Sequence, residues 1–157
     1  MIISQDDEIR MSELLIFMAI SSDVVEVPVA AGVFDEELNK VAESTNQREM
    51  GIDPTAHAEI VALRNAATSL GRWNLTGCTM YVTLEPCLMC AGAILESKIS
   101  RLVFGAFDIK KSFNLSGNEI IRESGQKIEV IGGVLEKKCQ LVMRNWFEHH
   151  RQKKGNI

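Results

Sequence analysis

Four side chains in the middle of the chain can bind a metal ion and move protons. His57 and Glu59 are separated by one alanine, and Cys87 and Cys90 form a C-x-x-C pair directly after a proline. One imidazole nitrogen and two thiolates are donors that Zn²⁺ prefers, and three protein donors leave a fourth tetrahedral position for water. A carboxylate beside that water can carry a proton to a substrate nitrogen. The pattern therefore predicts a catalytic zinc site with Glu59 as the proton carrier.

Each of these features also has a simpler interpretation. A lone histidine near a helix start is often a packing or capping residue, a C-x-x-C pair also suits thiol redox chemistry, and a glutamate in a first turn stabilises the helix. A closed structural zinc site would need a fourth protein ligand. The remaining candidates show no paired spacing with the cluster: Cys78, Cys139, His149 and His150. The combination of the three motifs therefore favours the open, catalytic arrangement.

The histidine is expected at the start of a helix. Apolar residues at a period of 3.6 predict a helix over residues 55–70, with Asp53 or Thr55 as its cap and Gly71 as its end. His57 would then lie within the first helical turn. Its imidazole would be held at the mouth of the helix.

The two cysteines are expected at the start of another helix. β-branched and aromatic residues predict a strand over residues 79–84, and a helix follows over residues 87–97, so that both sulfurs share one face. Helix amino termini favour the thiolate form that a metal requires. Similar patterns predict a helix over residues 6–18, strands over 27–34, 39–42, 101–106 and 127–131, and a terminal helix over 134–150. This alternation predicts an α/β fold with helices on both faces of a sheet.

The composition is that of an ordinary folded protein. The chain has 157 residues, of which 46% are hydrophobic and 24% charged, so we expect one compact domain over residues 1–157. No apolar stretch reaches the roughly 20 residues that a membrane span needs, and the acidic start is unlike a secretory signal. Four cysteines with a single close pair favour metal or redox chemistry over disulfides. These features predict a cytoplasmic protein.

Charge is distributed unevenly along the chain, whose formal net charge is −4. Residues 1–50 hold 3 basic and 11 acidic side chains, whereas residues 141–157 hold 4 basic and 1 acidic. A basic terminal helix and tail on an acidic body suits a local contact with nucleic acid but not broad, non-specific binding. The candidate phosphate contacts, each of which could equally be solvated surface, are Lys110, Lys111, Arg144, Arg151, Lys153 and Lys154.

Four segments together resemble one known family. The stretches DPTAHAEI (residues 53–60) and YVTLEPCLMCAGAI (81–94) closely resemble bacterial tRNA-specific adenosine deaminases, as do RLVFGAFD (101–108) and EVPVA (26–30). The H-x-E and P-C-x-x-C motifs are the signature of zinc nucleobase deaminases. The resemblance implies a three-layer α/β/α cytidine-deaminase-like fold with a mixed five-stranded sheet, a homodimer, and conversion of the wobble adenosine of a tRNA anticodon stem-loop to inosine.

The resemblance also implies roles for individual residues. The zinc would be held by three ligands, His57, Cys87 and Cys90, and Glu59 would shuttle protons. Asn46 matches the base-contacting asparagine of the family, Leu84 falls at the pocket wall, and Asp108 lies in the loop after the FGA strand. Asn46 could equally be a turn residue, and Asp108 a helix cap or loop acid.

Two segments depart from the family pattern, and two other functions stay open. Residues 109–114 replace a small-residue run with glycines, and the acidic residues 35–37 put the electrostatics of RNA docking in doubt. The same zinc chemistry also serves deaminases of free bases, nucleosides or nucleotides, of guanine, cytosine or cytidine type. A non-catalytic RNA-binding or zinc-stabilised scaffold is the alternative from another class, and it predicts that Glu59→Gln retains function.

Overall fold

The computed structural model describes residues 2–23, 25–108 and 117–154, with side chains up to residue 151. In this part of the chain, five strands form one sheet in the order β2-β1-β3-β4-β5. The strands are β1 (Ala30–Phe34), β2 (Lys40–Thr45), β3 (Thr79–Leu84), β4 (Arg101–Ala106) and β5 (Glu129–Gly132). β1 runs antiparallel to both β2 and β3, whereas β3, β4 and β5 are parallel, so the sheet is mixed as expected.

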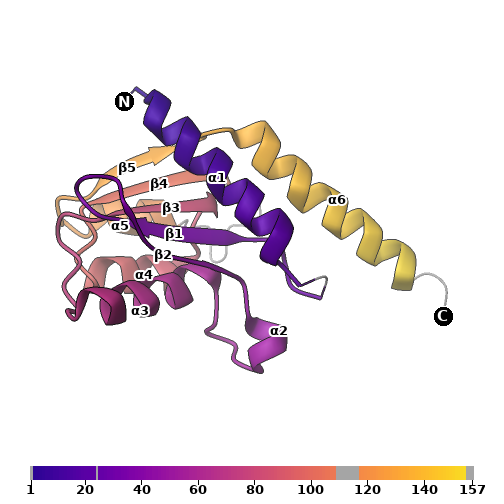
Figure 1. Ribbon diagram of the computed structural model, residues 1–157. Coiled ribbons are helices and arrows are strands. Elements are labelled where there is room, and N and C mark those ends of the chain that lie inside the picture. Colours follow the sequence, from indigo (N-terminus) through magenta and orange to yellow (C-terminus); the bar gives the residue numbers. More distant parts are fainter. Residues whose placement is uncertain (1, 24, 109–116, 155–157) are drawn as a thin grey trace.

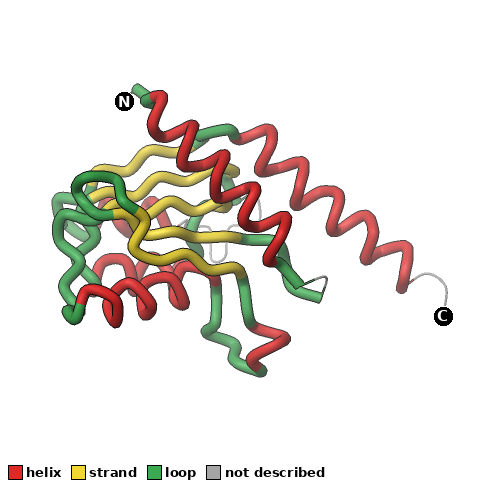
Figure 2. The backbone as a smooth tube through the Cα atoms, viewed as in Figure 1, coloured by secondary structure: helices red, strands yellow, loops and turns green. Residues whose placement is uncertain are grey.

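Helices cover both faces of this sheet (Figure 1). The helices are α1 (Gln5–Ser21), α2 (Arg48–Gly51), α3 (Ala58–Leu70), α4 (Leu88–Glu96), α5 (Gly117–Glu123) and α6 (Glu136–Lys154). α1 and α6 lie over one face, and α3 and α4 lie over the other, with α5 packed against α4. Figure 2 shows the strands between these two helical layers. The predicted three-layer α/β/α fold is therefore confirmed.

Alternation along the strands sends neighbouring side chains into two separate cores. In β3, Met80 and Val82 pack toward α3 and α4, whereas Tyr81 packs toward α1 with Met11 and Leu14. Successive side chains of a strand point to opposite faces of its sheet, so both cores depend on the same backbone. No helix within the described ranges is long and apolar enough to cross a membrane. The sheet between the two cores is the frame that holds the site.

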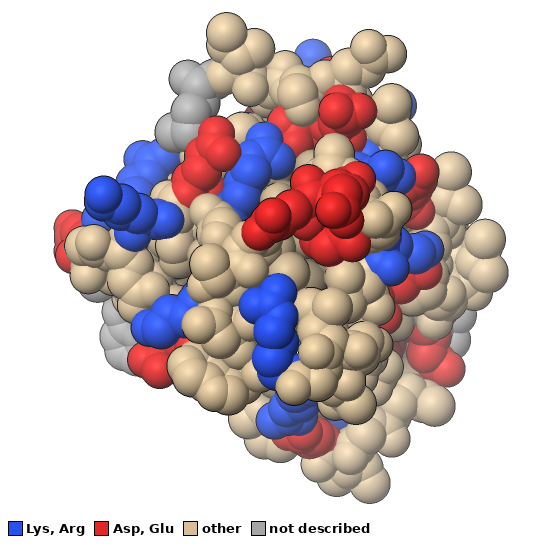
Figure 3. All heavy atoms as spheres, turned by 60° about the vertical axis from the view of Figure 1, so that its left-hand side comes forward, with Lys and Arg blue, Asp and Glu red and all other residues tan. Residues whose placement is uncertain are grey.

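The acidic turn of residues 35–37 lies at one end of the sheet. Phe34 pairs with Thr79, the first residue of β3, so the turn that follows Phe34 lies at the amino-terminal end of the parallel strands. Acidic side chains gather on this end of the molecule (Figure 3). Leu84, at the other end of β3, lines the candidate site. The turn is therefore separated from the site by the length of the strand, and its charge is not at the rim.

The structure corrects the predicted start of the histidine helix. α3 begins at Ala58, and its N-cap is His57 rather than Asp53 or Thr55. The Asp53 carboxylate accepts hydrogen bonds from the backbone N–H and the hydroxyl of Thr55, and the His57 N–H donates to the Thr55 carbonyl. These local bonds hold a turn where the sequence predicted helix. The predicted end is correct, because Gly71 caps α3 with φ of +63°.

Two short helices, α2 and α5, were not predicted from the sequence. Each has fewer than eight residues, and neither shows enough periods of an apolar pattern to be recognised. α2 matters for function because it follows Asn46 and carries Arg48 at its first position. Two of its backbone N–H groups donate hydrogen bonds to the carboxylate of Glu26, more than 20 residues away in the chain.

Candidate active site

Two helix starts bring the metal-binding side chains together. His57 is the N-cap of α3 and Cys87 the N-cap of α4, each with extended backbone angles. Neither side chain caps its own helix, so both are free to face each other. Cys90 lies three residues after Cys87, on the face of the first turn of α4. The histidine and the two cysteines form a group that could hold a metal ion, as predicted.

The distances in this group fit a tetrahedral zinc ion. His57 Nδ1 lies 3.7 Å from Cys87 Sγ and 3.5 Å from Cys90 Sγ. Zinc bonds of about 2.0 Å to nitrogen and about 2.3 Å to sulfur place two tetrahedral donors about 3.6 Å apart. The described residues bring no fourth histidine, cysteine, aspartate or glutamate into the group. Its donor set is that of an open site with three protein ligands.

The electrostatics of the group favour a thiolate. A hydrogen bond from Cys90 and another with His57 lower the pKa of Cys87 to about 4, although burial opposes this. The bond with Cys87, together with burial, raises the pKa of Cys90. The bond with Cys87 also raises the pKa of His57, against burial and the positive charge of Arg48. Proton release from Cys90 is therefore linked to cation binding, because a metal ligand must be a thiolate.

Glu59 lies beside the group and is buried. It is the second residue of α3, its side chain is 4% exposed, and it lines the same cavity as His57 and Cys87. Burial raises the pKa of its carboxyl group above the usual range. A carboxyl whose pKa moves toward neutrality can both accept and return a proton. This is the position and the chemistry expected of a proton carrier.

The remaining predicted residues line the same cavity, whose volume is about 170 Å³. Asn46 lies at its wall from the segment between β2 and α2, Leu84 from the end of β3, and Asp108 from the segment after β4. Cys90 is fully buried beneath it and is not a lining residue. The other lining residues, none of which was singled out from the sequence, are Val27, Val29, Arg48 and Glu85.

Glu26 organises one wall of this cavity, although the sequence marked it only as part of a family stretch. Its side chain is 1% exposed. One carboxylate oxygen accepts a hydrogen bond from Asn46 Nδ2 at 3.0 Å, and the other accepts from the backbone N–H groups of Glu49 and Met50 at 2.7 and 2.9 Å. Because a carboxylate accepts and cannot donate, these bonds fix the orientation of the Asn46 amide. Glu26 therefore ties the base-contact candidate to helix α2.

A second buried glutamate holds the opposite wall. Glu85 is 4% exposed, and its carboxylate accepts a hydrogen bond from the Asp108 backbone N–H at 3.1 Å. The Glu85 N–H in turn donates to the Ala106 carbonyl at 2.8 Å. These bonds connect the ends of β3 and β4. The Asp108 side chain, which is half-buried, is thus placed at the cavity by its backbone.

An apolar pocket of about 430 Å³ adjoins the cavity and shares three of its lining residues. α6 contributes Met143, Arg144 and Phe147 to this pocket, and Phe107 faces them from the segment after β4. Arg144, one of the predicted phosphate contacts, therefore lies next to the site. Arg151 is exposed near the end of α6. Lys110, Lys111 and the side chains of Lys153 and Lys154 lie outside the described residues.

Comparison with known proteins identifies relatives of the whole arrangement. Residues 4–106 match the zinc-binding region of cytidine and deoxycytidylate deaminases. A tRNA-specific adenosine deaminase of Haemophilus influenzae is 44% identical over 131 residues, which are 82% of this chain and 76% of that protein. The matched part includes the helix starts that carry the histidine and the cysteines, since both lie within residues 4–106.

Two solved structures have closely similar folds. One, from work on A-to-I editing by tRNA:A34 deaminases at the wobble position, has a TM-score of 0.76 and 34% identity, over 85% of this chain and 99% of that chain. The other, a guanine deaminase from Nitrosomonas europaea, has a TM-score of 0.76 and 27% identity, over 88% of this chain and 83% of that chain. Proteins with this fold therefore act on more than one substrate, and the fold by itself does not identify the substrate.

Proposed function

The chain belongs to the cytidine and deoxycytidylate deaminase family, and from this membership we propose that it converts the wobble adenosine of a tRNA anticodon loop to inosine. In this reaction water adds its oxygen to C6 of adenine, the bond from C6 to the amino nitrogen breaks, and ammonia leaves. The observation that carries the proposal is the placement of a buried glutamate beside a His/Cys/Cys group in one small cavity. The relative from Haemophilus influenzae favours tRNA as the substrate.

His57, Cys87 and Cys90 would hold a zinc ion through one Nδ1 and two Sγ atoms. Their separations match tetrahedral zinc, and Cys87 already favours the thiolate form. When bound by three protein donors, zinc lowers the pKa of a water molecule toward roughly 7 and so supplies a nucleophile at neutral pH. The two helix amino termini at Ala58 and Leu88 add partial positive charge that stabilises the thiolates.

Glu59 would move the protons of the reaction. It takes a proton from the attacking water, donates one to the ring nitrogen of the adenine, and protonates the departing amino group. Its burial keeps solvent away from these transfers. Asn46 and Leu84 would hold the base, the first by hydrogen bonding and the second by apolar contact along the cavity wall. A cavity of about 170 Å³ suits a single base turned out of its stack.

RNA is favoured over a free base by the pocket that adjoins the cavity. Aromatic side chains stack on bases, and arginine contacts the phosphate backbone. Phe107 and Phe147, with 43% and 37% of their surface exposed, flank this pocket together with Arg144. A loop nucleotide next to the target base could occupy it, whereas a free base would leave it unused. The cytoplasm, where a reducing environment keeps thiolate ligands intact, is the compartment that we propose.

The test is the formation of inosine by the zinc-loaded protein from an anticodon stem-loop with adenosine at the wobble position. Free adenosine, guanine and cytidine are assayed in parallel by ammonia release. We expect turnover of the stem-loop at least about 100-fold more efficient than that of any free compound, because the flanking contacts contribute only with RNA. The similarity to guanine deaminase supports the second candidate, a free-base deaminase, and preferential turnover of guanine would establish it instead.

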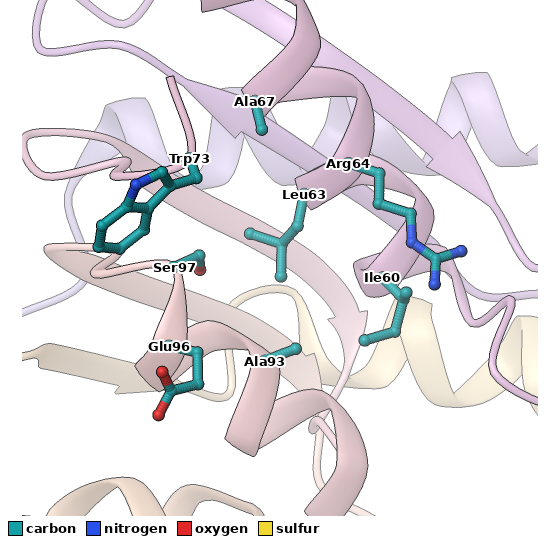
Figure 4. A pocket seen from close by; sticks show the side chains of 8 residues that line it. All are labelled: Ile60, Leu63, Arg64, Ala67, Trp73, Ala93, Glu96 and Ser97. Carbon is teal, nitrogen blue, oxygen red and sulfur yellow. The ribbon is translucent and has the colours of Figure 1, made fainter. Parts of the chain in front are cut away.

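The protein is proposed to act as a homodimer through the face formed by α3 and α4. A groove of about 460 Å³ runs between these helices, where Ile60 and Leu63 of α3 lie opposite Ala93 of α4 (Figure 4). Trp73, at one end of the groove, is 68% exposed. A large exposed aromatic beside an apolar groove is typical of an interface.

The dimer is tested by light scattering on two variants, each of which replaces an exposed apolar side chain with glutamate. Trp73→Glu is expected to give monomers. Ile16→Glu, on the helix that covers the opposite face of the sheet, replaces a side chain that is 62% exposed and should leave the dimer intact. A dimeric Trp73→Glu variant would place the interface elsewhere.

A further inference from the structure

We propose that Arg48 binds a phosphate group of the substrate at the mouth of the cavity. This inference rests on the proposed deaminase function and adds a binding residue to it. Arg48 lines the cavity together with His57 and Glu59, and it is the first residue of α2. Its side chain is exposed, so an extended ligand can reach it while the target base occupies the cavity.

The backbone of Arg48 is fixed from two sides. Its carbonyl oxygen accepts hydrogen bonds from the N–H groups of Ile52 and Asp53, which close the turn of α2. The two N–H groups that follow it, those of Glu49 and Met50, donate to the buried Glu26 carboxylate. A guanidinium on a fixed backbone loses less freedom when it binds a ligand than one on a mobile loop.

Glu26 also couples Arg48 to the proposed base contact. The same carboxylate that anchors α2 accepts a hydrogen bond from Asn46. The amide that would contact the base and the guanidinium that would contact a phosphate are therefore placed by one buried group. A nucleotide carries both a base and a phosphate, which favours a nucleotide unit over a bare base as the occupant.

Arg48 differs in charge from the other described residues of the cavity wall. Among the described residues that line the cavity, it alone carries a permanent positive charge, whereas Glu59, Glu85 and Asp108 are acidic. No ion pair or side-chain hydrogen bond joins Arg48 to any of the described residues. Residues 109–116, which lie outside them, contain no aspartate or glutamate. The planar guanidinium fork matches the oxygens of a phosphate and is available to bind one.

Phosphate could come from two sources, the backbone of an RNA loop or the monophosphate of a free nucleotide. Both offer the same bidentate acceptor. The position of Arg48 on the exposed side of the cavity, rather than within it, favours the RNA backbone, which continues past the target base. The experiment below separates these sources.

The experiment compares the full-length, zinc-loaded wild type with Arg48→Gln, Arg48→Lys and the control Lys127→Gln. Lys127 is exposed and precedes β5, at the amino-terminal end of the parallel strands and away from the cavity. Binding of a fluorescent anticodon stem-loop is measured by anisotropy at several salt concentrations, so that affinity is read without catalysis. Thermal melting of each variant checks that the fold is retained.

We expect Arg48→Gln to weaken stem-loop binding about 10-fold and to reduce the slope of log affinity against log salt by roughly 0.7 to 1. Arg48→Lys keeps the charge but not the fork, and should give a smaller loss with an unchanged slope. Lys127→Gln should match the wild type. Equal affinities and slopes for Arg48→Gln and Lys127→Gln would overturn the proposal.

Two further arms identify the source of the phosphate and separate this proposal from the function itself. A stem-loop with a neutral methylphosphonate beside the wobble adenosine should bind wild type and Arg48→Gln equally if the RNA backbone is the ligand. A preference of the wild type for adenosine monophosphate over adenosine, lost in Arg48→Gln, would assign the contact to a free nucleotide. Absence of inosine with the wild type would refute the deaminase function while leaving the binding difference intact.

Discussion

Two buried groups of ionisable side chains lie at opposite ends of the sheet, and the pKa of the buried carboxyl is lowered in one group and raised in the other. At the amino-terminal end of β4, the fully buried Asp7 carboxylate accepts hydrogen bonds from Arg101 at 2.7 and 2.9 Å and from the Tyr81 hydroxyl at 2.9 Å. Burial alone would raise the pKa of Asp7, but these bonds and two from Ser4 lower it to about 2. At the carboxyl-terminal end of β3, burial dominates and raises the pKa of Glu59.

This difference in pKa shift indicates that the Asp7 group contributes to stability, whereas the Glu59 group serves the reaction. Every oxygen of Asp7 has donors, so its charge is held and ties α1 to the sheet. Glu59 has fewer donors, its own backbone N–H and Cys90, and it lines a cavity, so its proton is available for transfer. We therefore expect substitutions in the first group to change the free energy of unfolding, and those in the second to change activity.

The largest effect is expected from removing a metal-binding thiolate. Cys87→Ser should lower zinc affinity by at least about 100-fold and abolish inosine formation, because one of the three proposed zinc donors is lost. Zinc per chain is measured by atomic emission after dialysis. The control is Cys139→Ser, which changes another cysteine, 2% exposed and outside the His/Cys/Cys group, and should retain zinc. Full zinc content in Cys87→Ser would contradict the assigned ligand set.

Removing the proton carrier should separate activity from stability most clearly. Glu59→Gln is expected to slow inosine formation by about 10³-fold while zinc stays bound, as for other general acid–base residues. Because burial raises the pKa of Glu59, its charge destabilises the fold at neutral pH, so the free energy of unfolding should not fall. Single-turnover assays and urea unfolding test this. Normal turnover would contradict the role of Glu59 as the proton carrier. The control is Glu123→Gln, a change of the same kind at an exposed position.

The opposite result is expected at the other end of the sheet. Asp7→Ala removes the acceptor of the Tyr81 hydroxyl and of two Arg101 hydrogen bonds, and should lower the free energy of unfolding by about 3 kcal/mol. Turnover per folded molecule should be unchanged. Asp6→Ala, at the exposed neighbouring position in the same helical turn, should cost no more than about 0.5 kcal/mol. Equal losses in free energy of unfolding from the two substitutions would mean that the buried hydrogen bonds of Asp7 do not add to stability.

Acid should reproduce part of this loss without mutation. The folded state lowers the pKa of Asp7 from 3.8 to about 2, so its contribution is complete above pH 4 and is lost as pH falls toward 2. The expected loss is about 2 kcal/mol. Urea unfolding at pH 5 and pH 2.5 measures it, and the change in Asp7→Ala should be smaller by that amount. Identical pH dependence in both proteins would assign the acid sensitivity to other carboxyl groups.

The smallest effect is expected from Tyr81→Phe. This substitution removes the hydroxyl that donates to Asp7 but keeps the buried ring, and should cost about 1 kcal/mol. In the Asp7→Ala background the same change should cost less, because the hydroxyl has then lost its acceptor. A double-mutant cycle compares the two losses in free energy of unfolding. Equal losses would show that the hydrogen bond from Tyr81 to Asp7 does not contribute to stability.

Local sequence patterns predict most of the fold and the group of side chains that could hold a metal ion. The grouping of His57, Cys87 and Cys90 is predictable because ligand types and their spacing at helix starts are local properties of the chain. Alternating and 3.6-residue apolar patterns were likewise sufficient for the sheet and its covering helices, since each pattern lies within one element. The start of α3 was misplaced by a local competition, in which Asp53 bonds to the Thr55 backbone and delays the helix.

The other residues that line the cavity depend on contacts between distant parts of the chain. Glu26 reaches Asn46 and helix α2 across 20 or more positions of the chain, and Asp7 reaches Arg101 across 94. No local spacing encodes such contacts, because they depend on the order and register of the strands between the partners. Arg48 lines the cavity from a helix that a carboxylate of another segment anchors. The type and spacing of residues limit the chemistry that they can perform, whereas the packing of the fold decides which partners they contact.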